Sequence, residues 1–282
     1  MLSASSRIIT RFGVTFLTDI VAATRRKVVE RRSRADLREL NRKSAAHNPR
    51  GFRRALKSAS NSGVAVIAEL KKASPSRGII RSDFDPTKLA RELELAGATA
   101  LSVLTDEEFF QGSLANLMTA SASTRIPCLR KDFIVDEFQI LEARANRADA
   151  ILLIVAALEQ TELVSLIRRA SEMELDVLCE VHDEEELQRA IDAGCNLIGV
   201  NNRDLATFRV SLETAFGLAE RIPAGVFAVA ESGIESGADI ARLRAAGYKG
   251  FLIGESLMRA KSPGEALKSL LAEATLPVGS TT

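Results

Sequence analysis

Histidine and cysteine, which build many metal centres and covalent catalysts, are scarce in this chain. Its 282 residues include two histidines and three cysteines. Cys128, Cys179 and Cys195 lie far apart in the sequence and form no C-x-x-C pair. This spacing argues against a zinc site and against a disulfide framework, and it fits a reducing cytoplasm. Acid–base chemistry must therefore rest mainly on lysine, glutamate and aspartate.

The histidines leave one metal-site alternative open. Glu180 and His182 have a spacing that could begin such a site, but the other histidine, His47, is remote in the sequence. We interpret His182 as a polar residue at the end of a strand and expect no bound metal.

The chain also lacks an excess of charge and a long apolar run. Its formal net charge is +1, so there is no electrostatic case for binding nucleic acid or an anionic membrane. No apolar run reaches the length of a membrane-spanning helix. The basic segment 25–34 contains Val28 and Val29 at helical positions. We interpret it as the solvated face of a helix, with a nucleic-acid patch as the alternative.

A strand–helix rhythm begins at Val64. Eight apolar segments have the composition of buried strands, and amphipathic segments lie between them. The expected strands are residues 64–70, 100–105, 126–131, 149–154, 175–180, 197–201, 226–231 and 250–254. This pattern predicts an α/β fold, a TIM (β/α)8 barrel, with a doubly wound open sheet as the alternative. No G-x-G-x-x-G or P-loop motif follows the first strand, which disfavours the open sheet.

Helical segments precede the first strand. We expect one helix over residues 16–34 and a shorter one that begins at Asn48. The prediction is a single barrel domain spanning residues 1–282, in which residues 1–60 form an N-terminal helical extension that caps the barrel. The first dozen residues have the character of a loose extension.

Charged and polar residues gather at the carboxyl ends of the expected strands. In a barrel these ends converge on one face, where active sites are built. Ionised groups next to apolar strands are costly to desolvate unless they are paired or used, so we interpret the set as functional. Its members are Glu69, Lys71, Thr105, Arg130, Lys131, Asp132, Glu180, Asn201, Arg203, Glu231, Ser232, Gly254, Glu255 and Ser256.

The last two strands are each followed by a loop that contains glycine, one with Ser232 and Gly233 and one with Gly254 and Glu255. Glycine lets backbone N–H groups approach a ligand closely, and barrels often bind phosphate in these two loops. The sequence therefore predicts a phosphate site here, with Lys71 as its side-chain cation. Plain turn glycines are one alternative, and a salt bridge from Lys71 to Glu69 is compatible with either reading.

The strand-end motifs resemble those of indole-3-glycerol phosphate synthase. The resemblance runs from about Phe16 to about Ala274, and its motifs are AELKKASPSRG, SVLTDEEFFQGS, LRKDFIVDEFQI, ADAILLIVAAL, CEVHDEEEL, GVNNRDL, AESGI and IGESLM. It implies a carboxy-lyase of tryptophan biosynthesis that acts on 1-(2-carboxyphenylamino)-1-deoxyribulose 5-phosphate. The products would be indole-3-glycerol phosphate, carbon dioxide and water. No step is a redox reaction, so no cofactor is expected.

The resemblance also implies roles for the acid–base residues. Lys131 would be the general acid that protonates the substrate ketone. Glu180 would be the general base or acid of the later dehydration, from a strand nearly opposite the one that carries Lys71. Lys71 would contact the substrate carboxylate or phosphate and could serve as a second acid. The remaining polar residues of this group, which would hold hydroxyls and one another, are Glu69, Asn201, Arg203 and Glu231.

Two further groups follow from the same resemblance. Phosphate would be bound by Ser232, Gly233, Gly254 and Glu255. An apolar wall for the anthranilate ring would consist of Phe110, Phe133 and Leu152, for which plain core packing is the alternative.

Two other functions are alternatives to this enzyme. A phosphosugar-binding barrel without catalysis would not need Lys131, Glu180 and Lys71 together, because binding alone needs no paired acid and base. A phosphoribosylanthranilate isomerase would rely on a cysteine and an aspartate at other strand ends. The expected partner is a small phosphorylated substrate, with no nucleic acid and no membrane, and the protein is expected to be a monomer.

Overall fold

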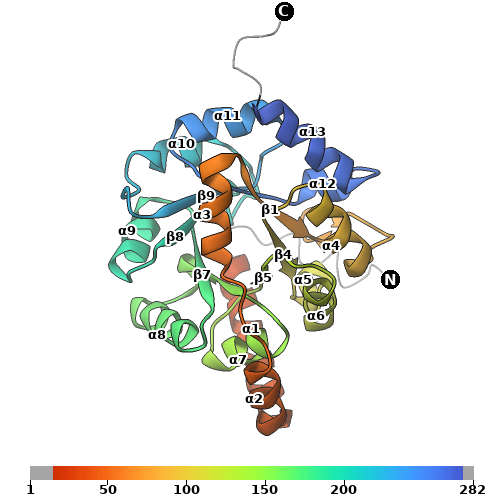
Figure 1. Cartoon of the computed structure of the whole chain (residues 1–282). Helices are drawn as coiled ribbons and strands as arrows, with labels where there is room; N and C mark the ends of the chain where they lie inside the picture. The colour runs from red at the N-terminus through yellow and green to blue at the C-terminus, as the bar shows by residue number, and fades with distance from the viewer. Residues whose placement is uncertain (1–14, 276–282) are drawn as a thin grey trace, which may run out of the picture.

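Eight parallel strands close into a barrel in the computed structural model, which describes residues 15–275 (Figure 1). The order around the barrel is β1-β10-β9-β8-β7-β6-β5-β4, with β4 pairing back to β1. This confirms the predicted fold class and excludes the open sheet. The barrel strands are β1 (Ala65–Leu70), β4 (Ala100–Leu104), β5 (Cys128–Lys131), β6 (Ala150–Ile154), β7 (Asp176–Val181), β8 (Leu197–Asn201), β9 (Phe227–Glu231) and β10 (Gly250–Ile253).

Helices surround the barrel, and Figure 1 shows them as an outer ring. Many begin after an Asp or Ser whose side chain accepts backbone N–H groups, as Asp85 does at the start of α4. The helices that follow the barrel strands are α4 (Pro86–Leu95), α5 (Glu107–Phe110), α6 (Leu114–Ala122), α7 (Glu137–Ala145), α8 (Gln160–Glu172), α9 (Glu184–Asp192), α10 (Glu213–Ala219), α11 (Gly237–Ala245), α12 (Glu255–Arg259) and α13 (Pro263–Thr275), together with the short 3-10 helix η2 (Val155–Ala157).

Three helices precede the barrel: α1 (Thr15–Arg34), α2 (Leu37–Ala45) and α3 (Phe52–Ser62). The middle one was not expected from the sequence. The loop after β1 also contains a small unexpected hairpin of β2 (Ala73–Ser74) and β3 (Gly78–Ile79). Within residues 15–275, no helix is both long and apolar enough to cross a membrane.

Helix α3 closes the end of the barrel opposite the carboxyl ends of the strands. Its Phe52 and Leu56 are fully buried and pack with inward-facing residues from the start of the strands, such as Ala65 and Ala100. Figure 1 shows α3 lying across this end of the barrel. The helix covers the face that in TIM barrels contributes stability.

A buried carboxylate fastens the extension to the barrel. Asp149, next to the start of β6, is fully buried and accepts both the backbone N–H and the guanidinium of Arg50. The backbone N–H of Cys128 donates to the same carboxylate, at 2.6 Å. These charge-assisted bonds fix the segment between α2 and α3 against β5 and β6.

The basic face of α1 is largely exposed, as the sequence interpretation expected, and several of its side chains also form ion pairs. Arg25 pairs with Glu162 at 2.8 Å and Lys27 with Glu108 at 2.6 Å. A third basic side chain of the helix, Arg31, approaches a carboxylate of α7 at 3.2 Å. Acidic residues on three neighbouring helices therefore orient α1. The pattern within α1 could not reveal these partners, because they lie 80 or more residues away in the sequence.

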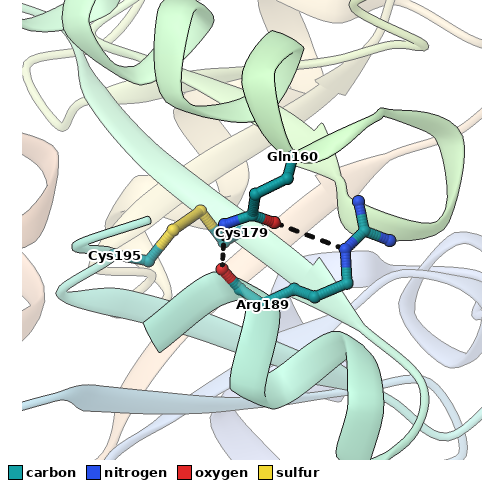
Figure 2. The surroundings of a disulfide bond; sticks show 4 residues. All are labelled: Gln160, Cys179, Arg189 and Cys195. Atoms are coloured by element: carbon teal, nitrogen blue, oxygen red, sulfur yellow. Dashed lines mark hydrogen bonds between the residues drawn. A yellow bond between two sulfur atoms is a disulfide. The ribbon is translucent and has the colours of Figure 1, made fainter. Parts of the chain in front are cut away.

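The exclusion of disulfides is wrong for one pair of cysteines. Cys128 is a buried free thiol, whereas Cys179 in β7 and Cys195, just after α9, form a disulfide (Figure 2). Their sequence separation is 16 residues, but α9 returns the chain so that their Cα atoms lie 6.6 Å apart. Alternation in β7 directs Cys179 toward the helices and the next residue, Glu180, into the barrel.

Candidate active site

A cavity of about 410 Å³ lies at the carboxyl ends of the strands. Because all eight strands run parallel, the charged residues at their ends meet here. The residues to which the resemblance gave roles all line this cavity: Glu69, Lys71, Phe110, Lys131, Phe133, Leu152, Glu180, Asn201, Arg203, Glu231, Ser232, Gly233, Gly254 and Glu255. Of the other strand-end residues interpreted as functional, Asp132 and Ser256 line it too, whereas Thr105 and Arg130 do not and instead donate hydrogen bonds to Asp132.

Lys131 lies at the centre of a buried charge cluster. Its Nζ donates to Oε2 of Glu180 at 2.7 Å and lies 3.5 Å from Oε2 of Glu231. Asn201 donates from Nδ2 to the other oxygen of Glu180, at 3.1 Å. The Glu180 carboxylate is therefore held on both oxygens. Oε1 of Glu231 is buried and has no hydrogen-bond partner among the described residues.

The surroundings shift the pKa values of this cluster in opposite directions. Burial alone would lower the pKa of Lys131, but the carboxylates of Glu180, Glu231 and Glu69 outweigh it and raise that pKa. Burial would raise the pKa of Glu180, but the Lys131 ammonium and His182 hold it well below its usual range. Burial raises the pKa of Glu231 to about 8, with Lys131 opposing the shift and the other carboxylates adding to it. At neutral pH the cluster thus holds the ammonium of Lys131 beside the carboxylate of Glu180.

A second ion pair lies on β1 and just beyond it. Lys71 Nζ is 2.7 Å from Glu69 Oε1, as the salt-bridge reading expected, and both side chains also line the cavity. Glu69 fills the space beside β10, where a side chain on Gly254 would have its Cβ 2.5 Å from Glu69 Oε1. Glycine is required at position 254 for this close approach.

The two glycine loops lie next to each other at the mouth. Ser232 and Gly233 both have left-handed backbones, with φ of 65° and 76°. Successive backbones of this kind can turn their N–H groups toward one concavity. Arg203 reaches across to Glu255 at 3.2 Å, so the loops after β8 and β10 are tied together by an ion pair.

Aromatic and aliphatic side chains form the other wall of the cavity. The rings of Phe110 and Phe133 have centroids 6.4 Å apart and are tilted by 38°. Leu152 contributes from inside the barrel, while Leu17 and Ile20 of α1 also line the cavity. The two α1 residues were missed in the sequence analysis. Their helical spacing showed an apolar face but gave no indication of what it faces.

Two polar residues, Ser74 and His182, lie in or beside the site although the sequence analysis gave them no role there. Ser74 lines the cavity with a buried hydroxyl that has no hydrogen-bond partner in the described part of the chain. The Ser-Pro-Ser loop was the signal that could have identified it. His182 lies against Glu180, with its Nε2 3.4 Å from Glu180 Oε1. Residues 15–275 contain no group of three or more His, Cys, Asp or Glu arranged to hold a metal ion.

Comparison with known proteins identifies the family. The family model for indole-3-glycerol phosphate synthase matches residues 17–270. An indole-3-glycerol phosphate synthase from Koribacter versatilis (strain Ellin345) is 59% identical over 255 residues, covering 90% of this chain and 98% of the relative.

Solved structures of lower identity share the fold. A 3-hexulose-6-phosphate synthase has a TM-score of 0.60 at 14% identity, over 74% of this chain and 99% of that one. Thiamine phosphate pyrophosphorylase from Pyrococcus furiosus has a TM-score of 0.57 at 19% identity, over 77% and 99%. At this identity the likeness concerns the barrel alone. With the family match over nearly its whole length, the chain belongs to the indole-3-glycerol phosphate synthase family, carboxy-lyases of tryptophan biosynthesis.

Proposed function

We propose that the cavity closes the indole ring of indole-3-glycerol phosphate with Lys131 as general acid and Glu180 as the base of dehydration. The observation that carries this assignment is the ammonium of Lys131, held at 2.7 Å from Glu180 inside the cavity. The direct test mixes the purified protein with 1-(2-carboxyphenylamino)-1-deoxyribulose 5-phosphate and follows indole fluorescence. No fluorescent product from correctly folded protein would contradict the proposal.

Ring closure needs a proton donor at the ketone. The aromatic carbon that bears the carboxylate attacks the ketone carbon, a carbon–carbon bond forms, and the carbonyl electrons move to oxygen. Lys131 supplies the proton for this oxygen. The carboxylates beside Lys131 keep its pKa raised, so that the donor is protonated before each turnover. Loss of carbon dioxide then returns the bonding electrons to the ring and restores its aromaticity.

Dehydration needs a base and an acid. The hydroxyl leaves from one carbon of the new ring while a proton leaves from the neighbouring carbon. Glu180 is suited to take the proton, because its lowered pKa keeps it a carboxylate at neutral pH. Lys71, which lines the same cavity, can protonate the leaving hydroxyl. Glu69, Asn201 and the other polar residues orient these groups and the substrate hydroxyls.

The glycine loops supply the phosphate site in this proposal. The left-handed backbones at Ser232 and Gly233 and the neighbouring Gly254 and Glu255 support backbone N–H contacts. Arg203 adds a guanidinium at the same edge. The substrate would then place its anthranilate ring against the wall of Phe110, Phe133 and Leu152 and its phosphate at the opposite side of the mouth.

Inorganic phosphate or sulfate is expected to inhibit competitively with substrate, because it would occupy the same loops. Arg203→Ala should weaken both inhibitor and substrate about tenfold, a typical loss for one charged hydrogen bond. Initial rates at several phosphate concentrations measure this effect. Arg209→Ala, on an exposed residue of the same loop, is the matched control. Purely non-competitive inhibition, or crystals from sulfate with an empty mouth, would count against the site.

The assembly and domain predictions remain proposals. We propose that the protein acts as a monomer. The packing of α3 into the barrel supports one domain that includes residues 1–60, of which the first fourteen lie outside the described residues. Light scattering during size-exclusion chromatography measures the mass of the active species.

A cytoplasmic location is proposed because a phosphorylated pathway intermediate is charged and does not cross membranes freely. The Cys179–Cys195 disulfide opposes this proposal, since cytoplasmic thiols are usually kept reduced. We therefore expect protein isolated anaerobically from its native cells to show three thiols after unfolding, and oxidised protein to show one. Thiol titration with mass mapping measures both. One thiol in the anaerobic sample would contradict the cytoplasmic assignment.

A further inference from the structure

His182 follows β7 directly and lies between two carboxylates. Its side chain is 11% exposed, and it is not among the residues that line the cavity. The ring is therefore close to the reacting groups without facing the substrate. Its two nitrogens point to different partners, one on α9 and one on β7.

Glu186, in the first turn of α9, fixes the ring from one side. Its Oε2 accepts the backbone N–H of His182 at 2.8 Å and lies 2.9 Å from ring Nδ1. Asp183 caps the same helix by accepting the N–H of Glu186 at 2.9 Å. The start of α9 thus positions a carboxylate that holds both the backbone and the ring of His182, which leaves the ring little freedom to rotate.

The other ring nitrogen faces Glu180. His182 Nε2 lies 3.4 Å from Glu180 Oε1, and this nitrogen is buried with no hydrogen-bond partner among residues 15–275. Oε1 is the same oxygen that accepts from Asn201, while Lys131 binds Oε2. The separation is that of an ion pair in a poor hydrogen-bond geometry, so the contact is mainly electrostatic.

The charges around the ring favour its protonated form. Burial would lower the pKa of His182, but Glu180 and Glu186 raise it to about 10. Asp204, from the loop after β8, also lies within the electrostatic reach of the ring. Glu186 faces ring Nδ1 and Glu180 faces ring Nε2, so a carboxylate lies at each nitrogen. Lys131 lies on the far side of Glu180 from the ring.

The protonated His182 ring supplies a second positive charge beside Glu180, in addition to Lys131. Lys131 is shared between Glu180 and Glu231. When Lys131 gives its proton to the substrate, Glu180 loses the positive charge on its Oε2, and burial would then favour its protonation. A protonated Glu180 could not act as a base in the next step. A second cation on Oε1 prevents this.

We propose that His182, oriented by Glu186, is a positioning residue that keeps Glu180 ionised and in place while Lys131 gives up its proton. The inference rests on the proposed function for its kinetic consequence, but the charge state of His182 can be measured without any turnover.

Nitrogen NMR of the two histidine rings tests the charge state. The chain has only His47 and His182, so the signal lost in His182→Gln assigns both. We expect the His182 ring to carry protons on both nitrogens at pH 8, and to become neutral at lower pH in Glu186→Gln. Glu185→Gln makes the same charge change at an exposed residue of the same helical turn and should leave the signal unchanged. A neutral His182 ring at pH 7 in the unaltered enzyme would overturn the inference.

The pH dependence of kcat tests the consequence for Glu180, because kcat reports the ionisations of the substrate-bound enzyme, in which Lys131 gives up its proton. Without the neighbouring cation the pKa of Glu180 rises, so the acid limb of the profile in His182→Gln should move to higher pH by about one unit or more. Glu186→Gln should move it in the same direction by less. KM should change little, since His182 does not line the cavity. A merely structural role would lower the rate or the melting temperature and leave the position of the acid limb unchanged.

The experiments distinguish a failure of the proposed function from a failure of the positioning role of His182. If the unaltered enzyme forms no indole-3-glycerol phosphate, the proposed function fails, while the NMR result still decides the charge of His182. If the enzyme is active and the profiles of His182→Gln and Glu185→Gln coincide, the positioning role is wrong and the assignment of Lys131 and Glu180 is untouched.

Discussion

Lys131→Met is expected to slow indole formation by about 10²–10⁴-fold, the typical contribution of a positioned general acid. Methionine fills similar space but cannot protonate the ketone oxygen. Substrate binding should change by a modest factor, because phosphate and ring contacts lie elsewhere in the cavity. Steady-state kinetics give the rate, and equilibrium fluorescence titration gives the affinity.

A lysine outside the cavity supplies the control for this experiment. Lys72→Met removes the same charge from a residue that is not among those lining the cavity, and it should keep nearly full activity. Because Lys131→Met leaves Glu180 and Glu231 without their shared cation, its melting temperature must be measured as well. A folded variant with near-normal turnover would remove Lys131 from the role of general acid.

Glu180→Gln is expected to separate carbon dioxide release from indole formation. The amide keeps the size of the side chain and its contact with Asn201, but it cannot take a proton from the ring carbon. Closure and decarboxylation should continue, whereas dehydration should slow by about 10²–10⁴-fold, as expected for loss of a general base. Single-turnover experiments that record carbon dioxide and indole fluorescence together should show the gas released first.

Glu69→Gln provides the comparison. Glu69 pairs with Lys71 at 2.7 Å, so its loss should alter turnover together with the affinity or the pH response that Lys71 governs. Carbon dioxide and indole should remain synchronous in this variant. If they remain synchronous in Glu180→Gln too, Glu180 does not serve the dehydration.

The barrel and the composition of its mouth were predictable because both follow from local patterns. Eight apolar segments with intervening helices define the strands, and parallel strands bring their carboxyl ends together. A charged residue such as Lys131 after an apolar run is visible in the sequence. For the same reason the placement of Glu180 on a strand four positions around the ring from β1 was correct.

Pairings between distant segments were not predictable in this way. The sequence placed Glu180 opposite Lys71, but the cation that contacts it is Lys131, two strands away across the barrel interior. The Cys179–Cys195 bond and the carboxylate partners of α1 also depend on how helices return the chain. Helix α2 was missed because its nine residues are mostly polar and the apolar pattern is short, with Leu37, Leu40 and Ala45 as its apolar residues.

The seam of the barrel joins its first strand to its last. Ala65 of β1 is in register with Gly250 of β10, and Glu69 fits beside Gly254. A ribosome that adds roughly 5–20 residues per second needs roughly 10–40 seconds between these two points. Throughout that interval one edge of β1 has no native neighbour, and an open edge can recruit strands from other chains. The yield of active enzyme should therefore depend on the speed of translation and on the chaperones present.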